Sequence, residues 1–230
     1  MAQFLHLLMQ MEIIHNTNPI NCNKMKKLMT LAALMLWTAV MWADSPLTST
    51  NFSRAYATHP MVEMAAELEA GDFLPTKLLD FLADKDSPVD ERMAVINSIG
   101  WAFEGHDGYS QLGDYLMKRY KVKTIDKLVK KLDAKTLCVY AYAKAMSNYF
   151  EVSEAARLAH EAVKKNKDNS FTVAFIAALI DAQIYLDSDW CAVYNVVADV
   201  AHDGSLKLDM EQGAIDIVME YINLYKEYCK

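Results

Sequence analysis

Apolar side chains recur every three or four residues along most of the chain after residue 60, which is the spacing of one face of an α-helix. One stripe contains Met61, Met64, Ala65 and Leu68, and the next contains Leu74, Leu78, Leu79 and Leu82. Strict alternation of apolar and polar residues never runs long enough to indicate a β-strand. The pattern therefore predicts an all-α protein made of antiparallel helices joined by short turns.

Polar residues that favour helix N-termini divide this pattern into separate helices. Ser87, followed by Pro88, predicts the start of a helix that ends at Gly105. The remaining expected helices are Tyr109–Tyr120, a short one after Thr124, Leu137–Phe150 capped by Asp133, Glu154–Lys165 capped by Ser153, one from Asn169 or Ser170 to Tyr185, Asp189–Ala201 capped by Ser188, and Leu208–Tyr228.

The segment 25–43 has the layout of a secretory signal peptide. Met25 and two lysines precede an uncharged apolar stretch that ends at Ala43, and a polar, Pro-containing segment follows. A stretch this short falls below the roughly 20 apolar residues of a membrane span. A buried core helix and a permanent membrane anchor are the alternatives. We expect cleavage near Ala43 and a periplasmic or extracellular protein with no stable membrane span after cleavage.

Residues 1–24 do not fit a signal that starts at Met1, because they have no basic leader before their apolar run. We therefore interpret 1–24 as an upstream extension added by gene calling, with translation starting at Met25. Residues 44–230 are expected to form a single helical domain, in which Asp44–Thr50 is a linker. Whether the chain starts at Met1 or Met25 is left open by the sequence.

The charge balance narrows the classes of partner. The first 43 residues hold three lysines and one glutamate, so residues 44–230 carry 20 of the 23 basic and 29 of the 30 acidic side chains, a net charge near −9. An acidic surface repels phosphate backbones, which argues against nucleic-acid binding and against adhesion to an anionic membrane. With only seven Gly and five Pro, the chain also lacks the turn residues that a β-sandwich needs.

Small residues recur in pairs that are 13 positions apart, which indicates a repeated helix hairpin. The pairs are Gly100 with Gly113, Ala143 with Ala156, and Ala178 with Cys191. The second and third pairs are 35 residues apart, and a small side chain lets two crossing helices approach closely. Ala143 is therefore expected at a tight helix crossing.

This pattern resembles the tetratricopeptide repeat, a helix-turn-helix of about 34 residues, over residues 90–201. Tyr142-Ala143 stands at the family's Leu-Gly position, and Ile99-Gly100 with Phe103 matches the first-helix pattern, whereas the family's terminal Pro is missing. The resemblance implies helix hairpins stacked as an irregular, TPR-like α-solenoid. A closed helical bundle is the alternative fold.

No motif for catalysis, a cofactor or a metal is present. The histidines of residues 44–230 are never three or four positions apart, as a helical metal site requires, and there is no phosphate-binding loop or nucleophile elbow. We therefore predict no catalytic residue, no cofactor and no metal. Cys138 and Cys191 are interpreted as small core side chains, although the disulfide status of Cys138, Cys191 and Cys229 is left open.

Two features indicate partner binding. The first is a basic run from Lys118 to Lys135 that either docks an acidic partner or forms a solvated helix face. The second is the stripe of Tyr140, Lys144 and Asn148, which stand four residues apart on one predicted helix. We predict this stripe as the site of an exported, non-enzymatic helical-repeat protein that binds a peptide or protein. The alternative function is an enzyme or glycan-binding protein on a helical scaffold.

Overall fold

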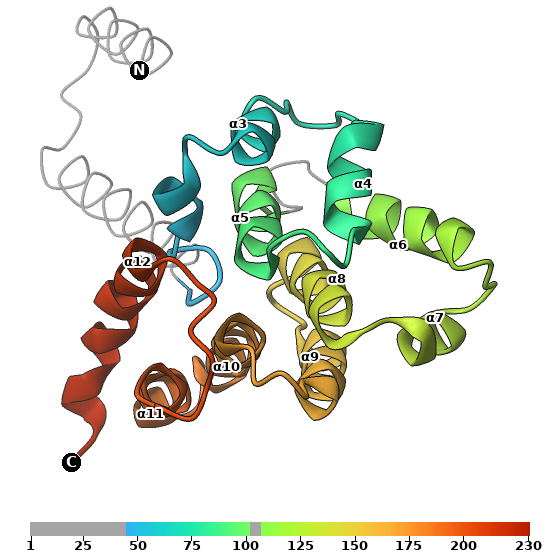
Figure 1. The fold of residues 1–230 in the computed structure, drawn as a ribbon. Coiled ribbons are helices and arrows are strands. Elements are labelled where there is room, and N and C mark those ends of the chain that lie inside the picture. Colours follow the sequence, from blue (N-terminus) through green and yellow to red (C-terminus); the bar gives the residue numbers. More distant parts are fainter. Residues whose placement is uncertain (1–44, 102–106) are drawn as a thin grey trace, which may run out of the picture. The chain divides into compact units, whose positions relative to one another are not determined.

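The computed structural model describes residues 45–101 and 107–230. The predicted extension 1–24, the predicted signal 25–43 and the residues Phe103, Gly105 and His106 lie outside the described residues. Ser45–Lys230 forms one unit. Apart from one parallel β-bridge between Ser170 and Lys207, its regular structure is helical in the described part, which confirms the all-α prediction (Figure 1).

The helices follow the predicted apolar stripes with shifted ends. Their order is η2 (Phe52–Tyr56), α3 (Pro60–Ala66), α4 (Thr76–Ala83), α5 (Val89–Ile99), α6 (Gly108–Arg119), α7 (Ile125–Lys131), α8 (Ala134–Ser147), α9 (Ser153–Lys165), α10 (Phe171–Tyr185), α11 (Trp190–Ala201), α12 (Gln212–Ile222) and η4 (Asn223–Tyr228). The α5 helix ends six residues before the predicted Gly105, because Gly100 adopts φ +82°, a conformation that only glycine takes up without strain.

The predicted capping residues are partly confirmed. The side chains of Thr124, Asp133 and Ser170 each accept a hydrogen bond from a backbone N–H in the first turn of α7, α8 and α10. Three predicted serine caps are wrong. Ser87 donates its hydroxyl to Asp84 instead, Ser153 is already the first residue of α9, and Asp189 rather than Ser188 caps α11. Where several polar residues are adjacent, the turn geometry decides which of them caps.

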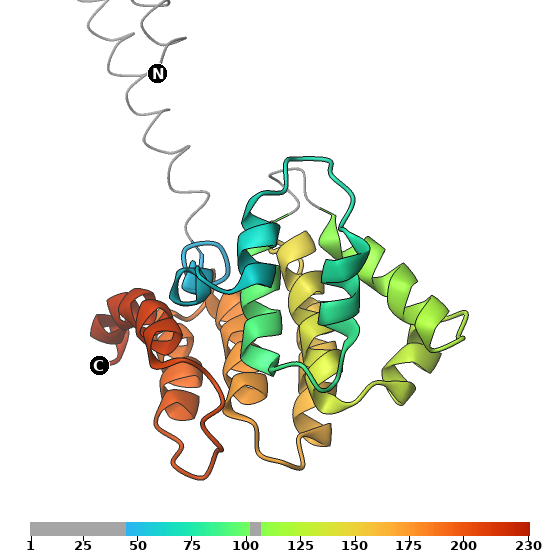
Figure 2. The ribbon, with the colours of Figure 1, turned by 45° about the horizontal axis from the view of Figure 1, so that its top comes forward.

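Helices α8 and α9 form one antiparallel hairpin and α10 and α11 form the next, and α10 packs against both α8 and α9 (Figures 1 and 2). The Cys138 thiol of α8 lies 3.6 Å from the carbonyl oxygen of Val173 in α10, across a sequence distance of 35 residues. The small-residue pairs of these helices, Ala143 with Ala156 and Ala178 with Cys191, are separated by the same number of positions. Gly100 does not belong to the series, because it ends α5. Helices α6 and α7 extend to one side of this row (Figure 2).

The segment before η2 is part of the core, which corrects its prediction as a linker. Leu47 and Thr50 are buried, and Phe52, the first residue of η2, stacks on Tyr142 of α8. The side-chain amide of Asn97 in α5 binds this segment, because it accepts a hydrogen bond from Ser53 N at 2.9 Å and donates to Thr50 O at 3.1 Å. The polar composition of residues 44–50 concealed this role, since a side chain from α5 satisfies the buried carbonyl of Thr50.

Candidate functional site

The predicted stripe on α8 is not one exposed surface. Tyr140 is 1% exposed, and its ring stacks on Tyr109 of α6 with the centroids 4.9 Å apart. Lys144 is half-buried, with its Nζ atom 4.6 Å from the Tyr109 ring centroid, and only Asn148, at the C-cap of α8, is exposed. The expected exposure of Tyr140 is therefore wrong, because α6 lies across that part of α8. Sequence spacing identifies a shared helix face but not the helix that covers it.

The basic run forms a hollow of about 510 Å³ at the end of α6 and along α7. We name it the basic hollow and define it by its lining residues, which are Lys121, Val122, Lys123, Lys127, Lys130 and Lys131. All five lysines are exposed, and Val122 is half-buried. Hollows of this size accommodate a ligand of a few hundred Å³ or a short segment of polypeptide.

Local sequence explains why the lysines converge. Helix α6 ends at Arg119, with Tyr120 as its C-cap. Lys121 then takes a left-handed conformation with φ +53°, so that Val122 N donates to Met117 O at 3.0 Å and the chain reverses direction. Thr124 then caps α7. Lys127, Lys130 and Lys131 are three and four residues apart on α7 and therefore share one face.

The base of the hollow is anchored to the core. Leu128 and Val129 are buried beneath α7. Lys165 from α9 donates to Val129 O at 2.6 Å and to Leu132 O at 2.7 Å, and so satisfies carbonyl groups at the C-terminus of α7. Lys131 also donates to Tyr120 O at 2.9 Å, which ties α7 to the end of α6. The backbone that carries the lysines is thus fixed on two sides.

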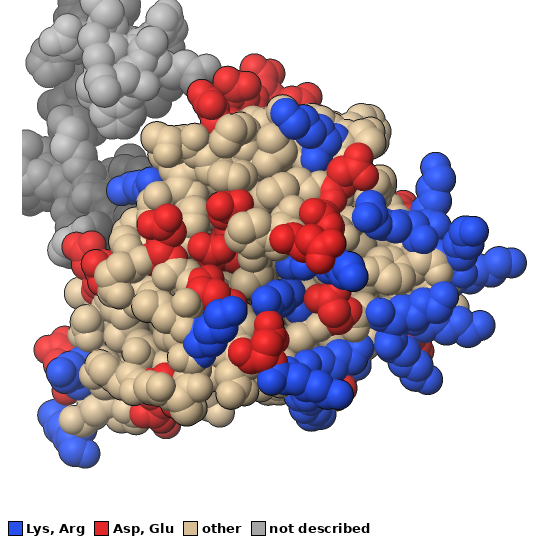
Figure 3. Space-filling model, viewed as in Figure 1, with Lys and Arg blue, Asp and Glu red and all other residues tan. Residues whose placement is uncertain are grey.

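Charge separation distinguishes this surface from the rest of the domain. Figure 3 shows Lys and Arg side chains gathered over α6 and α7, on the right of the view, whereas acidic side chains are more frequent over the rest of the visible face. Several cations outside the hollow form ion pairs, such as Lys135 with Asp168 at 2.8 Å and Arg157 with Glu154 at 2.6 Å. Within residues 45–101 and 107–230, none of the five lysines of the hollow forms an ion pair.

The helix dipole accounts for part of this charge. Lys130 and Lys131 lie in the last turn of α7, where a positive charge is favoured by the partial negative charge of the helix C-terminus. Lys121 and Lys123 lie between helices and Lys127 lies early in α7, so the dipole does not explain them. Like charges around one hollow repel one another, and an anion placed among them would relieve that repulsion.

The histidines of the described part have structural partners. His59 accepts from Met61 N at the start of α3 and lies 3.0 Å from a Glu91 oxygen, and His160 lies 2.9 Å from Asp181. No group of three potential metal ligands occurs among the residues that the structure describes. None of the helices in that part of the chain has the length and apolar character of a membrane span.

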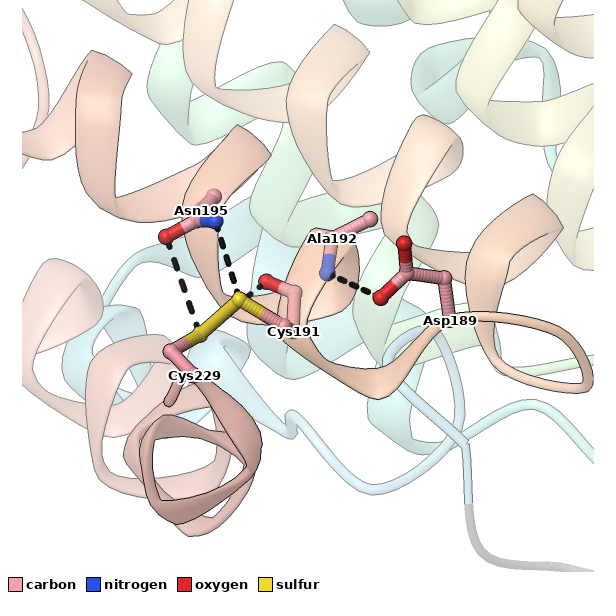
Figure 4. Close-up of a disulfide and its surroundings, with 5 residues drawn as sticks. All are labelled: Asp189, Cys191, Ala192, Asn195 and Cys229. Atoms are coloured by element: carbon pink, nitrogen blue, oxygen red, sulfur yellow. Dashed lines mark hydrogen bonds between the residues drawn. A yellow bond between two sulfur atoms is a disulfide. The ribbon is translucent and has the colours of Figure 1, made fainter.

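The cysteines are only partly as predicted. Cys138 is a buried free thiol, as expected for a core side chain, and burial raises its pKa to about 12. Cys191 is instead joined to Cys229 by a disulfide, which corrects its interpretation as a core residue (Figure 4). The two residues are 38 positions apart, and their proximity depends on how η4 folds back onto α11. The sequence contains no local signal for that return.

Comparison with known proteins provides no family for this chain. No protein-family model, no curated protein sequence and no solved structure matches it. Any binding at the basic hollow must therefore be inferred from the chemistry of its own side chains.

Proposed function

We propose that this chain is an exported, non-enzymatic, TPR-like helical protein that binds an acidic segment of a protein or peptide partner in the basic hollow. The single observation that supports this proposal is the convergence of five lysines, without ion-pair partners in the described part, on a domain with a net charge near −9. The opposite charges of domain and hollow would orient an acidic segment toward this one surface during diffusion.

The size of the hollow and the net charge of the domain favour a short acidic segment of polypeptide over a nucleic acid. The cations of the hollow are all lysines, flexible point charges that pair with a carboxylate as readily as with a phosphate. A long phosphate backbone would extend beyond the hollow over a domain with a net charge near −9, which disfavours it. A short acidic segment stays within the hollow, and half-buried Val122 offers it one apolar contact.

The disulfide supports export to the periplasm or the cell exterior. Disulfides persist in oxidising compartments and are rare in a reducing cytoplasm. The bond between Cys191 and Cys229 agrees with the signal-like segment 25–43, although the two observations are independent. N-terminal sequencing of the protein from its native host should give a start at or near Asp44. A cytoplasmic protein that retains Met1 would contradict export.

Charge reversal tests the proposed site. We expect poly-L-glutamate on a resin to retain the protein at low salt and to release it as salt rises, because exposed charges are screened. Replacing Lys127 and Lys130 together by Glu should abolish retention. The matched control is Lys77→Glu with Lys167→Glu, which makes the same change in net charge at exposed positions outside the hollow. The control variant should still be retained.

Two results would overturn this proposal. The first is equal retention of both double variants, which would show that the binding is not located at the hollow. The second is binding to vesicles that contain anionic lipid, or to tripolyphosphate, without binding to poly-L-glutamate. That second result would assign the lysines to a membrane surface or to a small anion rather than to a polypeptide.

A further inference from the structure

Two exposed aromatic rings meet where η4 returns to the first turn of α11. Trp190 is 46% exposed and Tyr228 is 45% exposed, and their ring centroids lie 4.5 Å apart with the planes nearly perpendicular, at 76°. The ring of Tyr225 is also steeply inclined to the Trp190 ring, at 71°, with the centroids 6.4 Å apart. We name the pair of Trp190 and Tyr228 the aromatic corner. Trp and Tyr that are exposed side by side combine an apolar ring with a polar group, and such residues are enriched at binding surfaces.

The disulfide fixes the aromatic corner from both sides. Cys191 directly follows Trp190 and Cys229 directly follows Tyr228, so the bond joins the neighbours of the two rings (Figure 4). The indole N–H of Trp190 donates to Leu186 O at 2.7 Å, which sets the orientation of that ring. Because these restraints act before any ligand arrives, little conformational freedom is lost when the exposed rings are covered.

Acceptors for hydroxyl groups lie in the turn that leads into Trp190. Asp187 and Asp189 are exposed in the turn that leads from α10 to Trp190. Asp189 uses one carboxylate oxygen to cap α11 through Ala192 N at 3.0 Å. The Tyr228 hydroxyl has no hydrogen-bond partner in the described part of the chain. The site thus combines two apolar ring surfaces with carboxylates and a free hydroxyl, and the carboxylates disfavour an anionic ligand.

We propose that the aromatic corner is a binding subsite for a neutral oligosaccharide. A sugar ring has an apolar face of C–H groups, which fits an exposed indole surface, and hydroxyl groups around its edge, which can donate to Asp187 and Asp189. A uronic acid or a sulfated sugar would be repelled by the same carboxylates.

The area of the corner argues against a second copy of the chain as its occupant. Side chains of this kind have about 150–250 Å² of surface, so two rings that are half exposed offer roughly 200 Å² in total. A stable protein–protein interface needs about 800 Å² on each partner. A single sugar ring is small enough to be covered by the corner alone.

Native gel electrophoresis of the full chain in gels that contain a neutral polysaccharide tests the subsite. The probes are soluble β-glucan, xylan and mannan, with dextran sulfate as the anionic comparison. We expect at least one neutral polysaccharide to slow the protein and dextran sulfate not to compete. Trp190→Ala should weaken binding about tenfold or more, as removal of a central aromatic contact does. Phe150→Ala, which removes an exposed aromatic ring outside the corner, should bind like the parent.

Several outcomes would overturn the subsite. One is that none of the three neutral polysaccharides slows the protein, and another is that Trp190→Ala binds as well as Phe150→Ala. The third is a concentration-dependent dimer, detected by size-exclusion chromatography with light scattering, that Trp190→Ala abolishes. Thermal melts of both variants confirm that they are folded, and Trp190→Phe serves as a second variant if Trp190→Ala unfolds. The basic hollow is formed by other residues, at the end of α6 and along α7. A negative result in the test of one site therefore does not contradict the proposal for the other.

Discussion

The ring of Tyr140 lies so close to Gly113 that a methyl group on residue 113 would come within 3.1 Å of the Tyr140 hydroxyl oxygen and 3.3 Å of its Cε2 atom. Gly113 is therefore the residue that allows α6 to cover α8. Its presence in the middle of α6 is costly for the helix itself, since glycine is less favourable than alanine there by about 1 kcal/mol. The contact with Tyr140 explains why the sequence tolerates that cost.

Gly113→Ala should therefore destabilise the protein by about 1–3 kcal/mol, even though alanine is the better helix former. Tyr140 is fully buried and stacked on Tyr109, so its ring has no room to retreat. Urea unfolding of the variant measures the change. In a Tyr140→Phe background, which removes the hydroxyl group at the closest contact, the penalty of Gly113→Ala should be smaller. A net gain in stability from Gly113→Ala alone would contradict this account.

Ala143→Leu should cost about 1–3 kcal/mol through overpacking. Ala143 is 3% exposed and borders a cavity of only about 10 Å³ between α5, α6 and α8, too small for the added carbon atoms. Ala66→Leu, at an exposed position of α3, is the control and should be nearly neutral. Indistinguishable thermal melts of the two variants would refute a tight helix crossing at Ala143.

Arg92 is a fully buried cation, and its Nε and Nη2 atoms have no hydrogen-bond partner in the described part of the chain. Burial lowers its pKa from the ordinary arginine range, and its Nη1 atom donates to Thr136 Oγ1 at 3.2 Å. Replacement of such a charge by an apolar side chain often stabilises a protein by about 1–4 kcal/mol. We expect Arg92→Met to raise the midpoint of chemical unfolding.

Thr136→Val provides the opposing test at the same site. It removes the one side-chain partner of Arg92 and leaves the cation in place, so the protein should lose about 1–3 kcal/mol. In the Arg92→Met background the loss should shrink, because no cation remains to be satisfied. Additive effects of the two substitutions would show that the hydrogen bond between them contributes little.

Cys138 should make stability fall at alkaline pH. Its pKa is about 12 in the folded protein, above the ordinary value of 9.0, because burial disfavours the thiolate. The folded state then holds its proton more tightly than the unfolded state, so stability is intact below pH 9 and declines as pH rises from about 9 to about 12. Cys138→Ala should flatten that decline. Rapid labelling of the native thiol by iodoacetamide at pH 9 would contradict its burial.

The disulfide closes a loop of 38 residues, for which the chain-entropy account gives a stabilisation of roughly 2–4 kcal/mol. Cys191→Ser with Cys229→Ser should lower stability by that amount, and hydrogen exchange should show the greatest loss of protection in η4. Helix η4 has no buried side chain of its own, so the disulfide and its aromatic contacts with Trp190 hold it against α11. Unchanged exchange in η4 would show that the aromatic contacts suffice.

Local signals in the sequence identify most of the fold. Helix periodicity locates the stripes, and Thr124, Asp133 and Ser170 cap the helices that they were expected to cap, because capping depends on a few neighbouring residues. The basic hollow was also visible as a run of lysines. These features concern contacts within one or two helical turns, where sequence spacing determines distance.

Features that depend on the path of the whole chain were missed. The burial of Tyr140 requires α6 to cross α8, and the pairing of Cys191 with Cys229 requires η4 to return to α11. The burial of the segment at Leu47 depends on an amide that lies far along the chain, at Asn97. The spacing and the polarity of these residues do not indicate which distant helix or segment they contact.

The hydroxyl group of Tyr56 joins one residue that is synthesised early in the domain to another that is synthesised late. It donates to Asp90 at 2.9 Å and accepts from Glu211 N at 3.0 Å, a partner 155 positions later in the chain. Because synthesis proceeds from the N-terminus, η2 and its neighbour α5 are complete long before α12 exists, and the docking site of η2 is finished only when α12 emerges. A contact that spans most of the domain forms more slowly than contacts between neighbouring helices, because a long loop of chain must close first.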